Sequence, residues 1–160
     1  MVKKILYLFI FFLGFYGQVA EAKTNLQLPR FVTVKAGEAN VRTGPGLRYQ
    51  IKWVLVRENM PVEVVGEFEQ WRKIKDVQND EGWIHRSMLT NKRSAIITGE
   101  TQVMRKNPDE ESQAVARLEV GVNVSLLGCK DEYCRVKVNR HKGWVRRDRL
   151  WGVYPDEVVN

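Results

Sequence analysis

Histidine and cysteine are scarce in this chain of 160 residues, which contains two of each. Neither histidine, His85 or His141, has acidic or cysteine residues nearby at the spacing of a metal site. No Gly-x-Ser-x-Gly motif is present, and Gly44-Pro45-Gly46 is not a phosphate-binding loop, because proline lacks the donor N–H that a phosphate would need. No pair of carboxylates is singled out for acid–base chemistry. We therefore expect no enzyme activity, no metal and no cofactor.

Long apolar runs are also rare. The run Ile5 to Gly17 follows Lys3 and Lys4 and precedes the small-x-small site Ala20-Glu21-Ala22, which predicts a secretory signal peptide over residues 1–22, cleaved between Ala22 and Lys23. Its 13 apolar residues fall short of the roughly 20 that span a bilayer, so an uncleaved anchor is the weaker alternative. No later run offers a second span, and we expect no stable membrane insertion after cleavage.

The chain is basic, with 26 Lys and Arg against 19 Asp and Glu. Cleavage at the predicted site leaves 24 basic and 18 acidic residues, a net charge of +6. Export argues against nucleic acid as the partner and favours anionic polymers or phospholipid head groups of the cell envelope. A solvated basic surface without a specific partner explains the charge equally well.

The two cysteines, Cys129 and Cys134, are separated by four residues. An exported protein meets an oxidising compartment, so a disulfide across a hairpin tip is expected. A redox-active pair is the alternative, but the spacing is not Cys-x-x-Cys and no thioredoxin-like pattern surrounds it. In the strand that follows the tip, Cys134 shares its parity with Val136 and Val138, so we expect it to face the core.

One short sequence motif occurs twice, as Glu81-Gly82-Trp83-Ile84 and as Lys142-Gly143-Trp144-Val145. Each copy is followed by a leucine, Leu89 or Leu150, at the end of its repeat. Other landmarks repeat 62 or 61 residues later, which predicts two copies of one small unit. The aligned pairs are Val41 with Val103, Gly66 with Gly128, Trp71 with Tyr133, Ile74 with Val136, Trp83 with Trp144, and Leu89 with Leu150.

Short alternating runs separated by turn residues predict an all-β fold, with about six strands in each unit closing into a small barrel. In the first unit the expected strands are 31–36, a short strand that begins at Ala39 and ends in the loop Gly44-Pro45-Gly46, then 51–56, 62–68, 71–77 and the segment that begins at Gly82. The expected organisation is a signal peptide 1–22, a flexible leader 23–30, barrels 31–90 and 95–153 joined by a linker 91–94, and a tail 154–160.

The run Asn40 to Gly46, the turn before Pro61-Val62-Glu63-Val64, Trp71-Arg72-Lys73-Ile74 and Gly82-Trp83-Ile84 resemble the bacterial SH3-like (SH3b) family. The likeness covers residues 31–90 strongly and 95–153 weakly, and is closest to the exported subfamily built from such domains alone. It implies two tandem SH3-like β-barrels that bind peptidoglycan stem peptides or cross-bridges. The second copy has Val103-Met104-Arg105-Lys106-Asn107-Pro108 in place of the first loop, so we expect it to be structural or to bind a protein.

A ligand groove is therefore expected on the first barrel. Its candidate residues are Asn40, Arg42, Tyr49, Trp53 and Trp71. Aromatic rings give contact area at small entropic cost, and an arginine can hold a carboxylate through two hydrogen bonds. Two alternatives stay open. Trp71 is either an exposed platform or a cover for the barrel end or for the contact between the barrels, and Arg42 either binds ligand or bonds its own loop carbonyls.

Three residues in the two repeated segments are not assigned to ligand binding. Trp83 and Trp144 are expected chiefly to pack, and His85 is expected to be a surface residue at the end of a strand. These patterns favour an exported, non-catalytic protein that binds a cell-wall peptide; the alternative is an envelope scaffold that docks a protein partner. We expect it in the periplasm, or else secreted or associated with the cell wall.

Overall fold

The computed structural model describes residues 26–35 and 37–159. The signal peptide with its Ala22/Lys23 cleavage site, and the start of the leader, lie outside these residues. Across the described chain, no helix has the length and apolar character needed to cross a bilayer.

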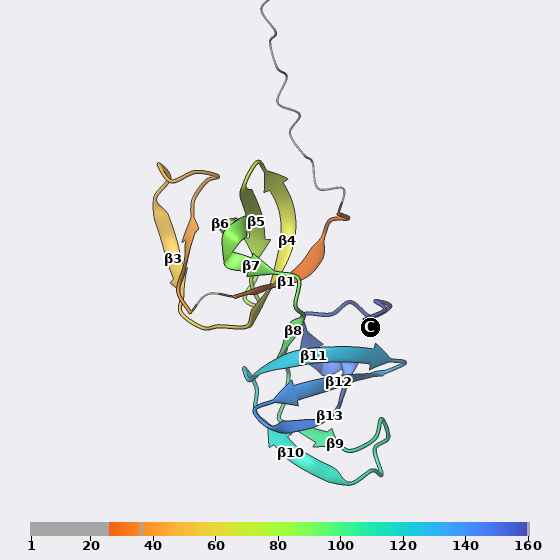
Figure 1. The fold of residues 1–160 in the computed structure, drawn as a ribbon. Helices are drawn as coiled ribbons and strands as arrows, with labels where there is room; N and C mark the ends of the chain where they lie inside the picture. Colours follow the sequence, from red (N-terminus) through yellow and green to blue (C-terminus); the bar gives the residue numbers. More distant parts are fainter. Residues whose placement is uncertain (1–25, 36, 160) are drawn as a thin grey trace, which may run out of the picture.

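The fold is all-β, as the alternating pattern predicted, and consists of two tandem barrels (Figure 1). In the first barrel the elements are β1 (Arg30–Val34), β2 (Ala39–Arg42), β3 (Ile51–Leu55), β4 (Met60–Phe68), β5 (Trp71–Lys75), β6 (Glu81–His85), the 3₁₀ turn η1 (Arg86–Met88) and β7 (Leu89–Thr90). In the second they are β8 (Ser94–Ile97), β9 (Gln102–Arg105), β10 (Ala114–Leu118), β11 (Asn123–Lys130), β12 (Tyr133–Val138), β13 (His141–Arg146), η2 (Arg147–Arg149) and β14 (Leu150–Trp151).

Each barrel is one seven-stranded sheet, and the two sheets have the same strand order. The first runs β3-β2-β6-β5-β4-β1-β7 and the second β10-β9-β13-β12-β11-β8-β14. Every neighbouring pair is antiparallel, which suits the short connections between consecutive strands. Gly66 in β4 and Gly128 in β11 follow matching register shifts, so the bulge that bends each long strand is duplicated as well.

The cores are built from aliphatic residues on the inward parity of the strands. Val41, Ile74 and Ile84 are fully buried in the first barrel, and Met104, Val136 and Val145 take the corresponding positions in the second. The predicted disulfide is confirmed: Cys129 and Cys134 are direct partners of β11 and β12, with Cα atoms 4.0 Å apart. Cys134 is fully buried in the second core, as its parity indicated.

One landmark of the predicted repeat was wrong by a residue. Val41 pairs with Trp53 of β3, and the equivalent pair in the second barrel is Met104 with Ala116. Met104 and not Val103 is therefore the counterpart of Val41, and both are fully buried. The first barrel has 24 residues between Val41 and Gly66, and the second has 23 between Met104 and Gly128. A constant offset of 62 taken from the later landmarks therefore pointed to Val103 in place of Met104.

The two barrels pack directly against each other. The hydroxyl oxygens of Thr33 in β1 and Ser94 in β8 are 2.7 Å apart and buried. Phe31 contacts the rings of Trp151 and Tyr154, with centroids 5.1 Å and 4.7 Å away. Ser94, expected at the end of the linker, thus belongs to a buried strand.

The C-terminal segment returns to this junction (Figure 1). Tyr154 donates a hydrogen bond of 2.7 Å to Glu63 in β4, and Glu157 forms an ion pair with Arg93 beside β8. The backbone N–H of Cys129 donates to the carbonyl of Val159, which is itself buried. The expected tail is loop-like, but it is packed along both barrels.

Candidate binding face

The outer side of the first barrel carries a row of cationic and aromatic side chains. Strand register places Trp83 of β6 between Arg42 of β2 and Lys73 of β5. Each of these residues alternates with buried ones, so each belongs to the outward parity of its strand. Arg42, Trp83 and Lys73 are all half-exposed. We call this row the outer face.

Trp83 was assigned chiefly to packing, and the structure places it, half-exposed, on the outer side of β6. The residue that points inward is Gly82, where an added Cβ would lie 2.4 Å from Val41 Cγ1 and 3.1 Å from the indole of Trp53. Because the core has no room for a side chain at this point, the next residue must face outward. Trp144 follows Gly143 in the same way in β13 and is also half-exposed. The sequence signal was the alternation of Trp83 with Ile84.

The loop from Thr43 to Gln50 stands beside the outer face and is closed by Arg42. Nη1 of Arg42 donates to the carbonyls of Tyr49, at 2.8 Å, and Leu47, at 3.2 Å. The interpretation in which Arg42 bonds its own loop is therefore confirmed. These two bonds use a single guanidinium nitrogen, and the side chain stays half-exposed.

Tyr49 lies on the glycines of this loop. A Cβ added to Gly44 would be 2.4 Å from its ring and one added to Gly46 would be 3.4 Å away. Arg48 lies 5.2 Å from the centre of the same ring. The loop glycines therefore allow the backbone to approach a flat aromatic ring, which a side chain at Gly44 would displace.

The second barrel repeats the loop but not the aromatic ring. Arg105 donates to the carbonyl of Ser112 at 2.7 Å, as Arg42 does to Tyr49. The backbone bond that joins Thr43 to Gln50 recurs between Lys106 and Gln113. The loop and its arginine are therefore features of the shared fold, while the residue at the Tyr49 position distinguishes the first barrel.

The structure brings together three of the five predicted site residues. Asn40 is exposed on the same side of β2 as Arg42, and Tyr49 is bonded to Arg42 through its carbonyl. Trp53 has the inward parity instead and packs against the first core, with its Nε1 buried and unpaired within the described chain. It therefore lies on the opposite side of the sheet from Arg42.

Trp71 does not form an open platform, because it is only 8% exposed. Its parity does point outward, but its ring meets that of its cross-strand partner His85 edge-on, with centroids 5.4 Å apart. The alternative in which Trp71 covers the end of the barrel fits this burial. His85 is half-exposed and bonds to Ser87 through Nδ1.

The chemistry of the outer face suits an elongated polar ligand. Arg42 can donate to a carboxylate, and the half-exposed indole of Trp83 offers a flat apolar contact. Lys73 forms an ion pair with Glu81, and the hydrogen bond from Lys73 lowers the pKa of that carboxyl. No group of three or more potential metal ligands occurs among the described residues.

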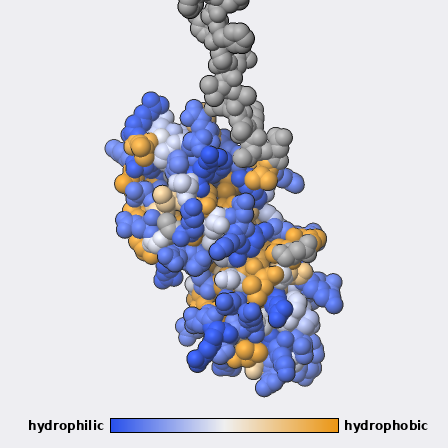
Figure 2. All heavy atoms as spheres, in the orientation of Figure 1, coloured by the Kyte–Doolittle hydropathy of each residue, from blue (hydrophilic) through white to orange (hydrophobic). Residues whose placement is uncertain are grey.

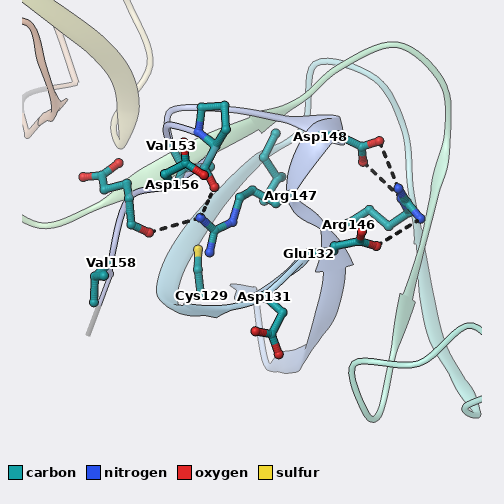
Figure 3. Close-up of a pocket in the computed structure, with 12 residues that line it drawn as sticks. Cys129, Asp131, Glu132, Arg146, Arg147, Asp148, Val153, Asp156 and Val158 are labelled. Carbon is teal, nitrogen blue, oxygen red and sulfur yellow. Dashed lines mark hydrogen bonds and ion pairs between the residues drawn. The ribbon is translucent and has the colours of Figure 1, made fainter.

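The second barrel has a hollow of about 740 Å³ between the disulfide-bearing tip, η2 and the C-terminal segment. Figure 3 shows its two arginines pointing to opposite sides. Arg146 bonds to Asp148 and Glu110, and its hydrogen bond lowers the pKa of Asp148; Arg147 bonds to tail carbonyls, among them that of Pro155. Both guanidinium groups therefore donate to acceptors of this chain, and these bonds stabilise the walls of the hollow.

Similarity to individual known proteins is low. No curated protein matches the chain. Two solved structures, NlpC2 and NlpC1 from Trichomonas vaginalis, are 12% and 14% identical, with TM-scores of 0.38 and 0.36. The matches cover 82% and 81% of this chain but only 51% and 48% of those chains, and likeness at this level supports no conclusion about function.

The family profile of the bacterial SH3 domain matches twice, over residues 35–91 and 98–152. Each match covers one of the two barrels, and together they span more than half of the chain. The chain therefore belongs to the bacterial SH3 domain family, as a tandem of two such domains.

Proposed function

We propose that this chain is an exported, non-catalytic protein that binds a peptide of the cell wall through its first barrel. Ligand contact is assigned to Asn40, Arg42, Tyr49 and Trp83, with the buried Trp71 and the partly buried Trp53, which lies on the inner side of the sheet, as supports of the strands that carry them. The domains of this family are binding modules, which supports a role in binding without catalysis. The ligand class is a peptidoglycan peptide with a free carboxylate.

The observation that carries the proposal is the contrast between two loops of the same shape. Tyr49 lies flat on Gly44 in the first loop, while the second has Ser112 and Asn107 at these positions. The fold itself does not require the ring, since the second loop keeps its backbone bonds and its arginine without one. A ring kept beside Arg42 fits recognition of a ligand better than support of the loop.

Export rests on the N-terminal pattern of Lys3, Lys4 and the apolar run that follows, which lies outside the described residues. A periplasmic or wall-associated location would place the barrels beside their ligand. The predicted +6 charge of the mature chain would add a general attraction to anionic wall polymers. That attraction should fade at moderate ionic strength, whereas contacts within the outer face should persist.

Co-sedimentation with isolated sacculi tests the proposal. The chain from Lys23 onward is compared with Tyr49→Ser and Asn40→Val, which install the residues that the second barrel carries at these positions. Because the second barrel folds with serine and valine there, we expect intact folds by circular dichroism. We expect each variant to lose most of its binding in moderate salt.

The matched control is Ser112→Ala in the second loop, which should sediment like the wild type. Binding that survives both substitutions in the first barrel would overturn the assignment of the site. No sedimentation by the wild type would overturn the wall ligand and favour the envelope scaffold that docks a protein partner.

A further inference from the structure

β3 is an edge strand whose outer side is unpaired. It pairs with β2 on one side, and no other strand of the described chain adds to it on the other. An edge strand presents backbone N–H and C=O groups that another chain can pair with, and natural proteins usually protect such edges with charged residues. The residues along β3 therefore indicate whether this edge is protected or available.

The edge is apolar. Ile51 and Val54 within the strand are 49% and 38% exposed, and Val56, directly after it, is 71% exposed. Leu47, in the loop that precedes the strand, is 79% exposed. Figure 2 shows apolar residues along the outer left edge of the upper domain, where Figure 1 places β3. The strand thus presents exposed apolar side chains, with Lys52 as the charged residue within it.

The second barrel shows that the fold does not require this edge to be apolar. β10 occupies the same place in the second sheet and pairs with β9 in the same register as β3 with β2. Where the first barrel has Leu47, Ile51, Val54 and Val56, the second has Glu110, Ala114, Arg117 and Glu119. The second barrel in turn has Val115 and Val120 where the first has Lys52 and Arg57, so the two edges differ in where apolar and charged residues fall and in the sign of the charge.

Basic residues surround the apolar edge. Arg48, Lys52 and Arg57 are all exposed along it, with Glu58 as the acidic neighbour. Two copies of this edge would bring the same three cations of both chains into one interface, which like-charge repulsion disfavours. Charge complementarity therefore favours a different strand, one that carries acidic residues between apolar ones.

We propose that the free edge of β3 docks an extended segment of a protein partner in which acidic and apolar residues alternate. The segment adds as a further strand beside β3, so its backbone pairs with the free groups of the edge. Its apolar side chains cover Val54 and Val56, and its carboxylates meet Arg48, Lys52 and Arg57. This inference goes beyond the proposed function, because it uses the sheet edge and does not depend on wall binding by the outer face.

The test uses a fluorescent synthetic peptide of five Glu-Val repeats, measured by anisotropy with the mature chain. We expect saturable binding that is at least about tenfold weaker for a peptide of Lys-Val repeats, because that peptide repels the basic edge. Protection of β3 amides from hydrogen exchange should accompany binding. Failure to bind the Glu-Val peptide, equal binding of both peptides, or protection confined to other strands would overturn the proposal.

The decisive variant is Val54→Arg with Val56→Glu, which carries the residue types of Arg117 and Glu119 of the second barrel and should fold as that barrel does. We expect at least about tenfold weaker peptide binding, with the fold intact by circular dichroism. Val158→Glu, at an exposed apolar residue of the C-terminal segment, is the control and should bind like the wild type. A concentration-dependent dimer that the β3 substitutions abolish would identify a second copy as the occupant and overturn the proposed partner.

Discussion

Glu67 and Arg72 form an ion pair across β4 and β5 at the position that the disulfide occupies across β11 and β12. Arg72 Nε is 3.2 Å from Glu67 Oε1, and these two residues are direct cross-strand partners, as are Cys129 and Cys134. Arg30 pairs with the same carboxylate from β1. Arg72 is buried, and its Nη1 also donates to the carbonyls of Glu69 and Trp71. An ionic network thus closes the hairpin that a covalent bond closes in the second barrel.

Neutralising this carboxylate should destabilise the first barrel. Glu67→Gln removes the charge that two arginines share, and we expect a loss of about 2 kcal/mol in the free energy of unfolding, since hydrogen bonds to charged groups contribute roughly 1.5–3 kcal/mol. Urea denaturation followed by tryptophan fluorescence measures it. Glu58→Gln, at an exposed glutamate of the same barrel, is the control and should change the midpoint little. Equal effects of the two substitutions would contradict the network.

Reduction of the disulfide should destabilise the second barrel to a comparable degree. The bond closes a short loop, so the chain-entropy model gives about 2 kcal/mol. We expect a reductant to lower the urea midpoint of the wild type and to leave that of Cys129→Ala/Cys134→Ala unchanged. Two thiols titratable in the native protein without reductant would show that the bond is absent.

The contact between Tyr154 and Glu63 should give the junction a dependence on high pH. Burial, together with the hydrogen bond to Glu63, raises the pKa of Tyr154 above its ordinary value of 10.0. Because the folded state holds the proton more tightly, this stabilisation is complete below the ordinary pKa and is lost as the pH rises through the folded pKa.

Tyr154→Phe tests this dependence. We expect it to cost about 1 kcal/mol near neutral pH, because Glu63 loses a donor, and to remove the last tyrosine to ionise in a phenolate absorbance titration of the mature chain. Tyr49→Phe is the control, and should leave the late-ionising group in place. A titration in which Tyr154→Phe changes nothing at the alkaline end would contradict the assignment.

Substitution of Gly82 should be costly because two core residues approach it. Gly82→Ala places a Cβ 2.4 Å from Val41 Cγ1, and overpacking of this kind typically costs about 1–3 kcal/mol. Gly66→Ala is the matched control in the neighbouring sheet region, because its Cβ would be 3.4 Å from that of Lys73, close to ordinary contact. Thermal melts of both variants measure the difference. A Gly82→Ala protein as stable as the Gly66→Ala protein would show that the core can relax around the methyl group.

The sequence by itself determined the fold class, the duplication and the disulfide. Alternation of apolar and polar residues sets which residues share a face of a strand, and turn residues mark where strands end. The parity of Cys134 with Val136 placed it in the core, and its partner then had to lie across the hairpin. Each of these features depends on residues close together in the chain.

Only the tertiary structure decided which side of each strand is covered. Trp83 faces outward because Val41 and Trp53, from other strands, fill the space inside Gly82. Trp71 has outward parity and is nevertheless buried, with His85 of the adjacent strand against its ring. The junction formed by Thr33, Ser94 and Tyr154 joins residues of both barrels. Local pattern determines alternation, but the burial of a given side chain depends on which distant segments pack against it, and that is settled only when the chain is folded.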